Sequence, residues 1–323
     1  MGKRFSVALI GAGVMGSNHA RIVSNHPKAD LKLVLDTNVG AAQKLAGDHG
    51  AQATNSTKDL EGIDAVIVAS PTEYHFDITK FCISRGIPVL VEKPLTGKIE
   101  ETEELVKLSS ANKSVLMCGL LERFNPAILT AEQIDINPEH FMAVRHSPFT
   151  PRIRSNVSLD LMIHDIDLAL RFVKLTPSRV RSVEINTRSK GGVPDISEAI
   201  LEFGGHAVAH LSASRSSQQK IRRIHMSDST RLVEIDLLRR NLTITKNVSE
   251  TSLNFGKGYR QGSEVEIPEL VTSVEPLAAQ FEYFLRLIKD EENITAERNS
   301  LIEPHRILSQ VIRSNKISES ELG

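Results

Sequence analysis

The sequence predicts an α/β protein in which a doubly wound parallel sheet is followed by a second, mostly antiparallel sheet. The chain has 323 residues, which corresponds to about two domains at ~150 residues each. In the first third, short aliphatic runs alternate with helical stretches, as is typical of parallel strands joined by crossover helices. Further along, several candidate strands follow one another directly, and such strands pair antiparallel. We therefore expect two domains, over residues 1–120 and 121–323.

Five short aliphatic runs, bounded by Gly, Pro, Asp or Ser, are the predicted parallel strands. They are Phe5–Ile10, Leu31–Leu35, Ala65–Ala69, Pro88–Val91 and Val115–Cys118. Helices are expected between them, near residues 14–26, 38–49, 73–85 and 99–112. Right-handed crossovers leave few topologies for this order, and the doubly wound sheet is the commonest of them.

The pattern changes after Gly119. Helical character near 125–135 leads to a strand at Phe141–His146, and an apolar helix is expected over about 159–173. The alternating runs that follow predict strands near 180–185, 196–203, 206–213, 219–226, 231–236 and 242–246. Helices near 275–289 and 300–314 complete the predicted second domain.

The composition excludes several classes of function. Apolar residues make up 40% and charged residues 24% of the chain, which is ordinary for a globular protein. The net charge of −1 gives no long-range attraction to nucleic acid or to an anionic membrane, and the absence of Trp argues against a stacking surface for single strands. No apolar run approaches the ~18 residues of a membrane span. Two cysteines make no disulfide framework, so we expect a reducing, cytoplasmic location.

The strongest motif is the run Gly11-Ala12-Gly13-Val14-Met15-Gly16, which follows the first strand and opens a helix. Gly11 permits a tight turn, Gly13 lets the backbone approach a pyrophosphate, and Gly16 allows close helix–strand packing. Asp36 ends the second strand 20 residues after Gly16, where it can accept hydrogen bonds from ribose hydroxyls. Because its charge would repel a 2′-phosphate, the sequence predicts a Rossmann domain that binds NAD in preference to NADP. The alternative is a glycine-rich turn without a ligand.

Two further segments follow predicted parallel strands. The segment Ser70–His75 comes after Ala65–Ala69, and Glu92-Lys93-Pro94 comes after Pro88–Val91. Ligands of open α/β sheets bind at the carboxyl ends of the strands, where both segments belong. The charge state of a lysine there is sensitive to burial and to a neighbouring cation, so Lys93 is a candidate for proton chemistry. The alternative is a solvated lysine.

Asp160 and His164 are four residues apart in an otherwise apolar predicted helix, so they share one face. A general acid/base role for His164, with Asp160 orienting its ring, suits the ordinary pKa of histidine. His164 could instead be a hydrogen-bonded core residue. A metal site is disfavoured because the segment offers one histidine, and none is predicted.

Other residues have simpler interpretations. We expect His19, on the first helix, to be structural. Arg152 and Arg154 lie in a proline-containing loop that is either solvated or binds a phosphorylated substrate. Lys220, Arg222 and Arg223 are expected to form a solvated strand face.

In the combination of Gly11–Gly16, Asp36, Glu92-Lys93-Pro94 and Asp160-x-x-x-His164, the chain resembles the Gfo/Idh/MocA oxidoreductases. The resemblance implies NAD(P)-dependent oxidation or reduction of a sugar, cyclitol or nucleotide-sugar. It also implies a C-terminal α/β domain with an open, mostly antiparallel sheet that often mediates homodimers or homotetramers. By motif match, Lys93, Asp160 and His164 take the catalytic positions, and Ser70–His75 is the loop beside the nicotinamide.

The predicted site follows from the motif and the resemblance together. The expected cofactor contacts are Gly11, Gly13, Val14, Met15, Gly16, Asp36, Ser70, Thr72, His75 and Glu92. The segment Leu121–Pro126 and the 151–154 loop look most like those of nucleotide-sugar (UDP-N-acetylglucosamine-type) 3-dehydrogenases. The expected substrate contacts are Lys93, Arg123, Arg152, Arg154 and His164. The family's usual glycine run before the Asp-x-x-x-His motif is replaced by Ser155–Ser158, which leaves a non-catalytic dinucleotide-binding sensor as the alternative.

Overall fold

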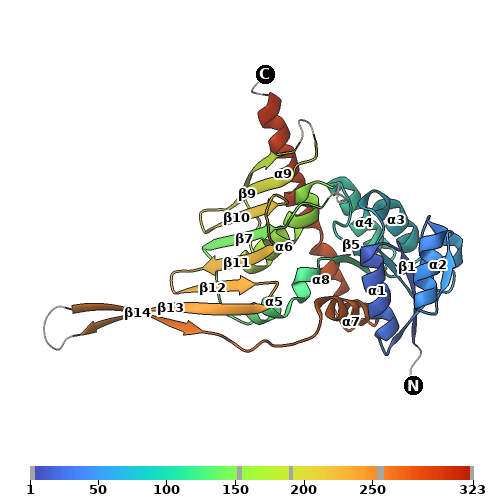
Figure 1. Ribbon diagram of the computed structural model, residues 1–323, viewed down its shortest axis with the longest axis horizontal. Coiled ribbons are helices and arrows are strands. Elements are labelled where there is room, and N and C mark those ends of the chain that lie inside the picture. Colours follow the sequence, from blue (N-terminus) through green and yellow to red (C-terminus); the bar gives the residue numbers. More distant parts are fainter. Residues whose placement is uncertain (1–3, 151–154, 189–191, 253–257, 321–323) are drawn as a thin grey trace. The chain divides into compact units, whose positions relative to one another are not determined.

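The computed structural model describes residues 4–150, 155–188, 192–252 and 258–320. It divides into two compact units (Figure 1). The first unit consists of residues 1–121 and 275–306, and the second of residues 122–274 and 307–323. Each unit has its own sheet, so the two architectures expected from the sequence are confirmed.

The sheet of the first unit is parallel, with six strands in the order β3-β2-β1-β4-β5-β6. The strands are β1 (Phe5–Ile10), β2 (Ala29–Leu35), β3 (Gln52–Thr54), β4 (Ala65–Val68), β5 (Val89–Glu92) and β6 (Leu116–Gly119). All four residues of β4 are fully buried, as expected for a central strand covered on both faces. The order reverses between β1 and β4, so the carboxyl ends of these two strands flank the topological switch point, where ligands of such sheets bind.

Four helices of the first unit, α1 to α4, lie between these strands in the chain, and three later helices, α7 to α9, contribute residues to the same unit. They are α1 (Val14–Asn25), α2 (Val39–Asp48), α3 (His75–Ser84), α4 (Ile99–Ala111), α7 (Pro276–Ile288), α8 (Ile294–Asn299) and the first turns of α9 (Ile302–Ser320). Short 3₁₀ turns lie at η1 (Thr57–Leu60) and η2 (Thr72–Tyr74). The predicted helix over 73–85 therefore begins with a tighter turn.

The sequence predicts a second domain that contains all residues after 120. In the structure, Glu275–Arg306 belongs to the first unit instead. Arg21 of α1 donates to both carboxylate oxygens of Glu275. The backbone N–H of Leu95 donates to His305 Nε2 at 2.9 Å. These pairings join residues 254 and 210 positions apart, which local sequence patterns do not reveal.

The second unit contains an eight-stranded sheet in the order β14-β13-β12-β11-β7-β10-β9-β8. The strands are β7 (His140–His146), β8 (Arg179–Ile185), β9 (Ile196–Phe203), β10 (Ala207–Ser214), β11 (Ile221–Ser227), β12 (Arg231–Asp236), β13 (Asn241–Ser252) and β14 (Gly258–Glu266). Only β7 and β10 pair in parallel, and the other neighbours are antiparallel. The mostly antiparallel sheet is thus confirmed.

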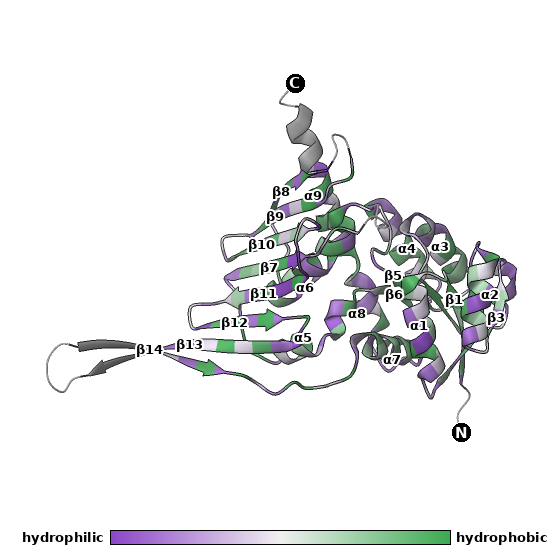
Figure 2. Ribbon diagram, viewed as in Figure 1, coloured by the Kyte–Doolittle hydropathy of each residue, from purple (hydrophilic) through white to green (hydrophobic). Residues whose placement is uncertain are grey.

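Strands of this second sheet alternate in burial. Ala199, Leu201 and Phe203 of β9 are buried on one face, whereas Ile200 between them is 43% exposed on the other. Figure 2 shows the corresponding change of hydropathy along these strands. The buried face contacts α5 (Pro126–Ala131) and α6 (Ile163–Val173). Ser182 of β8 also donates to the backbone oxygen of Val311 in α9. The sheet therefore has one helix-covered face.

Two elements of the second unit differ from the sequence prediction. The expected helix over 159–173 starts with a π-helical turn, η4 (Ser158–Met162), and continues as α6. β13 pairs with β12 only up to Lys246 and then continues with β14 alone (Figure 1). β14 and the second half of β13 were not predicted because residues 247–266 are mostly polar and lack the alternation that marks a half-buried strand.

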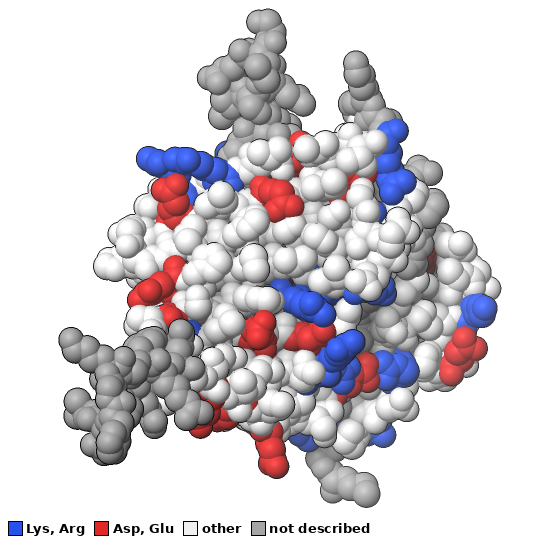
Figure 3. Space-filling view, turned by 60° about the vertical axis from the view of Figure 1, so that its left-hand side comes forward, with Lys and Arg blue, Asp and Glu red and all other residues white. Residues whose placement is uncertain are grey.

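Charge and polarity of the described residues add two observations. No described helix has the length and apolarity that crossing a membrane requires. On the face drawn in Figure 3, basic and acidic side chains are interspersed, so neither sign forms a continuous field there. This mixture agrees with the net charge of −1.

The two cysteines provide a test of the first unit. Cys82 and Cys118 are not joined in a disulfide, and both are buried in its core. Burial raises the pKa of the Cys82 thiol to about 12, so its reactive thiolate is scarce at neutral pH.

We expect neither thiol to react with Ellman's reagent in the native protein and both to react after denaturation. Rapid native labelling of Cys82 would contradict this packing.

Candidate active site

The turn between β1 and α1 is built by two glycines that no other residue could replace without movement. Gly11 has φ +107°, and a Cβ there would lie 2.5 Å from the backbone oxygen of Ala69. A Cβ on Gly16 would lie 2.0 Å from the backbone oxygen of Gly11. Their absent side chains let α1 begin directly against the ends of β1 and β4.

The same turn fits a pyrophosphate. A Cβ on Gly13 would have no protein atom within 4 Å, so the chain's own packing does not require glycine there. Gly13 is the N-cap of α1, no side chain caps the helix, and its first turn holds no acidic residue. The N–H groups and positive dipole end of a 12-residue helix thus suit an anionic ligand. The neighbouring Val14 is 57% exposed at the turn, and Met15 is half-buried.

Asp36 follows β2 and is fixed beside the glycine turn. Its Oδ2 accepts a hydrogen bond from the backbone N–H of Ala12 at 2.7 Å, and its Oδ1 accepts one from Asn38 at 2.8 Å. Each carboxylate oxygen keeps further acceptor capacity for a hydroxyl group. The position and charge of Asp36 therefore fit a ribose with two free hydroxyls better than one that carries a phosphate.

The loop after β4 is tied to the loop after β5 by His75. This buried imidazole has Nδ1 2.9 Å from the backbone oxygen of Pro94 and Nε2 2.8 Å from that of Ser70. His75 thus joins the two loops from within the first unit. Ser70 and Thr72 lie on the same stretch, with Thr72 beginning the 3₁₀ turn η2.

Glu92, at the end of β5, is a buried carboxylate with a partner on α1. His19 Nε2 lies 2.7 Å from Glu92 Oε1, and His19 is only 1% exposed. Burial works against the charged carboxylate, but the hydrogen bond and charge of His19 and the charge of Lys93 outweigh it, so the pKa of Glu92 is lowered. Since an ionised carboxylate only accepts hydrogen bonds, His19 Nε2 carries the proton. The structural interpretation of His19 is supported, because its imidazole fixes Glu92, the residue that precedes Lys93.

In the second unit, the predicted Asp160–His164 segment lies at the start of α6. Asp160 is in the π-turn η4, and its Oδ2 accepts a hydrogen bond from Arg215 Nη2 at 2.7 Å. Arg215 follows β10 and also donates to the backbone oxygen of Ser155. His164 is in the first turn of α6 and is 8% exposed. Asp160 thus has an arginine partner that the sequence did not indicate.

A network of buried charges includes Asp165, the residue that follows His164. Arg145 of β7, which is 1% exposed, donates to both oxygens of Asp165 at 2.7–3.0 Å and to Glu122 at 2.7 Å. Arg222 of β11 also donates to Glu122, at 3.2 Å. Burial dominates at Asp165 and raises its pKa, whereas at Glu122 burial is outweighed by Arg145 and Arg222, so the pKa of Glu122 is lowered.

Two predictions about arginines need comment. Arg123 was predicted to contact substrate, but its guanidinium is buried and forms two hydrogen bonds with Asp167 of α6, at 2.8 and 2.6 Å. The prediction of a solvated strand face is wrong for Arg222. Arg222 lies opposite Arg145 in the sheet, on the face that the helices cover, and its guanidinium donates to Glu122. Arg223 on the opposite face is 57% exposed, as expected. Arg152 and Arg154 lie outside the described residues.

Sequence reasoning missed Arg145, Arg215 and the buried role of Glu122. The signal for Arg145 was an arginine at an inward position of an alternating strand, because Phe141 and Ala143 share its face. Among the residues that the structure describes, no cluster of three or more His, Cys, Asp or Glu side chains is arranged to hold a metal ion.

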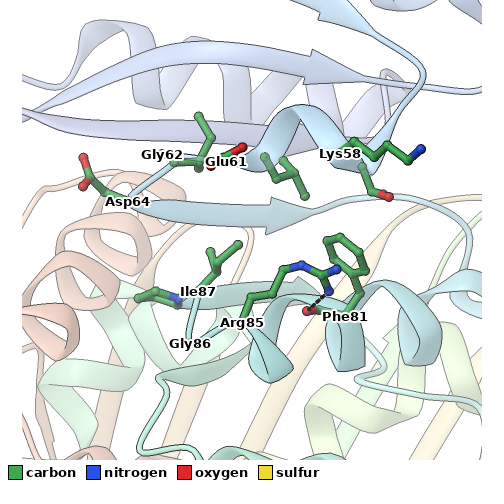
Figure 4. A pocket seen from close by; sticks show the side chains of 12 residues that line it. Lys58, Glu61, Gly62, Asp64, Phe81, Arg85, Gly86 and Ile87 are labelled. Carbon is green, nitrogen blue, oxygen red and sulfur yellow. Dashed lines mark hydrogen bonds between the residues drawn. The ribbon is translucent and has the colours of Figure 1, made fainter.

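A groove of about 780 Å³ lies at the amino ends of β4 and β5, at the edge of the sheet away from the glycine turn. Lys58, Glu61 and Asp64 line one side and Arg85 the other, with the Arg85 guanidinium 3.6 Å from the centroid of the Phe81 ring (Figure 4). Its position at the amino ends separates it from the predicted cofactor residues. We assign it no role.

Comparison with known proteins identifies both units. A family model described as "Oxidoreductase family, NAD-binding Rossmann fold" matches residues 5–120, and one described as "GFO/IDH/MocA C-terminal domain" matches residues 138–230. The chain is 31% identical over 239 residues to UDP-N-acetylglucosamine 3-dehydrogenase of Acidithiobacillus ferrooxidans, covering 73% of this chain and 75% of the relative. It is 28% identical to scyllo-inositol 2-dehydrogenase (NAD(+)) of Bacillus subtilis, covering 65% and 67%.

Solved structures agree with these relatives. The structure of UDP-N-acetylglucosamine 3-dehydrogenase from A. ferrooxidans has a TM-score of 0.87 at 28% identity, with 96% of this chain and 97% of that chain covered. The structure of GenD2 from gentamicin A biosynthesis, in complex with NAD, has a TM-score of 0.82 at 21% identity, with 98% of this chain and 95% of that chain covered. The latter likeness concerns the fold alone.

The His19–Glu92 pair gives a test of the site. In His19→Ala the buried Glu92 carboxylate loses its partner, which should lower the free energy of unfolding at neutral pH by about 3 kcal/mol. In the wild type the lowered pKa of Glu92 stabilises the fold above the unfolded pKa, and this contribution is lost as the pH falls through the folded pKa. Without His19, we expect the pKa of Glu92 to be higher than in the wild type, because burial is then opposed by Lys93 alone. Mild acidification then relieves the buried charge in the variant, so the difference in free energy of unfolding between the two proteins should become smaller.

Urea unfolding at neutral pH and near pH 5 measures both effects. His140→Ala is the matched control, because His140 is exposed. Equal stabilities of His19→Ala and the wild type, or a difference that widens on acidification, would refute the pairing.

Proposed function

The chain belongs to the Gfo/Idh/MocA family of NAD-binding oxidoreductases, and from this premise we propose that it transfers a hydride between NAD and a secondary alcohol of a sugar, cyclitol or nucleotide-sugar. The observation that carries the proposal is that both candidate proton-transfer residues follow or adjoin a fixed carboxylate. Lys93 follows Glu92, whose buried carboxylate pairs with His19. His164 lies in the first turn of α6 next to Asp165, which pairs with Arg145.

Different segments of the first unit are proposed to bind the pyrophosphate, the adenosine ribose and the nicotinamide of NAD. The N–H groups of the first turn of α1 suit the pyrophosphate, with Gly13 leaving room for its approach. Asp36 accepts hydrogen bonds from the adenosine ribose hydroxyls. Ser70, Thr72 and His75 belong to the loop proposed to lie beside the nicotinamide. The bound cofactor supplies or accepts the hydride.

Lys93, His164 and Asp160 carry the proton chemistry in this proposal. When the alcohol is oxidised, the carbinol C–H electron pair leaves as hydride, the hydroxyl proton passes to a base, and the electrons of the O–H bond form the C=O bond. The base is the neutral imidazole of His164 or the amine form of Lys93. Where His164 takes the proton, the ammonium of Lys93 stabilises the developing alkoxide, as preorganised charge does in many active sites. Asp160, held by Arg215, orients the imidazole. Reduction reverses these transfers.

Nucleotide-sugars are the substrates we favour within this class. The relative that is 31% identical is a UDP-N-acetylglucosamine 3-dehydrogenase, and the inositol dehydrogenases support the wider class of polyols. Arg152 and Arg154 are proposed to bind the substrate's phosphates. Turnover of NAD with UDP-N-acetylglucosamine, other nucleotide-sugars and inositols tests the assignment. Binding of NADH without turnover of any of them would favour a dinucleotide sensor instead.

We also propose that the chain forms homodimers or homotetramers through the sheet face opposite α5 and α6. Ile200 and Val183 on that face are exposed, at 43% and 55%. Light scattering coupled to size-exclusion chromatography would show a dimer or tetramer, and a monomer at micromolar concentration would refute this part.

Substitution of the proton-transfer residues should separate chemistry from cofactor binding. We expect Lys93→Ala and His164→Ala each to lower turnover by ~10²-fold or more, the usual effect of losing a positioned acid or base. NADH affinity, measured by fluorescence titration, should stay within about twofold. The controls are Lys98→Ala and His210→Ala, whose side chains are 71% and 45% exposed. Wild-type turnover of Lys93→Ala and His164→Ala would exclude the mechanism.

Asp36 should determine the choice of dinucleotide. We expect the wild type to bind NADH at least about tenfold more tightly than NADPH, because the carboxylate repels a 2′-phosphate. Asp36→Asn keeps an oxygen for the Ala12 N–H and removes the charge, so the preference should shrink. Fluorescence titration with each dinucleotide measures it, and equal affinities in the wild type would contradict the role of Asp36.

A further inference from the structure

Three acidic residues lie close to His164 in the sequence, and each is paired with an arginine from a different element. Asp160 pairs with Arg215 after β10, Asp165 with Arg145 of β7, and Asp167 with Arg123 of η3 (Leu121–Phe124). We call Arg123, Arg145 and Arg215 the arginine clamp. All of these residues belong to the second unit.

The contacts of the clamp are directional. Arg123 and Arg145 each bond both oxygens of their acid, which fixes the carboxylate in position and in rotation. The three arginine side chains are each 6% exposed or less. The clamp therefore holds the π-turn and the first turns of α6 at points before and after His164.

Arg145 has the most complete environment of the three. Together with Asp165, Glu122 and Arg222 it forms a cluster of two positive and two negative side chains, so the charges cancel. Asn125 Nδ2 donates to Glu122 at 3.1 Å and fixes the far end of the cluster. Glu122 is thus oriented by Arg222 and Asn125 in addition to Arg145, whereas Asp165 is held by three hydrogen bonds from Arg145 itself.

The stability of the fold alone does not explain why these arginine–carboxylate pairs are buried. Removing charges from water costs several kcal/mol per ion, and apolar side chains of similar volume often stabilise a core as well or better. What the charged set supplies is fixed geometry, because a guanidinium fork accepts only a few arrangements of its carboxylate. Asp165 is the residue next to His164, so this geometry is transmitted to the backbone of the histidine.

We propose that Arg145 is a positioning residue for the reaction, which acts by holding Asp165 and thereby the orientation of the His164 imidazole. The inference rests on the proposed function, since it takes His164 as the acid/base. Arg145 has no assigned contact with substrate or cofactor. Its effect should therefore fall on turnover and on the backbone around His164, and cofactor affinity should not change.

The test compares Arg145→Lys with Arg171→Lys. Arg145→Lys keeps the charge but loses the fork, and Asp165→Asn is a second variant that keeps the shape of the acid. Arg171 lies in α6, as Asp165 does, and its guanidinium pairs with Glu132. Because this pair is partly exposed, with the Arg171 side chain 35% exposed, Arg171 is the matched control. The measurements are kcat, KM and the pH profile with the best nucleotide-sugar or inositol of the panel, NADH affinity, and amide hydrogen exchange of the 158–168 peptide.

We expect Arg145→Lys and Asp165→Asn to lower kcat by about tenfold to a hundredfold, the scale of a small misplacement of a catalytic group. The pH profile should shift, exchange in the 158–168 peptide should rise, and NADH affinity and the control should match the wild type. If Arg145→Lys and Asp165→Asn lower thermal stability but leave kcat and its pH profile unchanged, the role of Arg145 is structural only and the inference is overturned. Wild-type turnover of His164→Ala would instead refute the proposed function, so the two failures are distinguishable.

Discussion

Backbone packing at the first strand–helix turn is the constraint on which the first unit depends. A Cβ at Gly16 would overlap the backbone oxygen of Gly11, and one at Gly11 would overlap that of Ala69. These contacts fix where α1 starts relative to β1 and β4. They also place His19, one turn further along α1, where its imidazole reaches Glu92. The dinucleotide turn and the segment that carries Lys93 are thus parts of one packed assembly.

The second unit uses buried charge for a comparable purpose. His164 is flanked by acids that would be costly to bury alone, and each is neutralised by an arginine from a separate element. In the first unit, backbone packing and one histidine–carboxylate pair fix Glu92, the residue before Lys93. The second orients His164 through guanidinium forks, which define direction more strictly than apolar contacts. In both cases the groups proposed for catalysis are held by residues that do not react.

Local patterns were sufficient to predict the elements with strong periodicity or full burial. Ala65–Val68 and Ile196–Phe203 were predicted within one residue, because one is a continuous aliphatic run and the other alternates regularly. β3 has three residues, none of them buried, and leaves no such pattern. β14 is mostly polar. For the site, the glycine motif and Asp36 were readable because their spacing is set by local geometry. The pairs His19–Glu92 and Arg145–Glu122 were not, since they join residues 73 and 23 positions apart.

The central claim is that Lys93 and His164 act on the same carbinol group. A crystal structure with NADH and a nucleotide-sugar that the protein turns over would test this claim most directly. The account predicts the Lys93 ammonium and the His164 imidazole within hydrogen-bonding distance of one substrate oxygen, on a carbon that faces C4 of the nicotinamide. A substrate hydroxyl at the nicotinamide that contacts neither residue would contradict it.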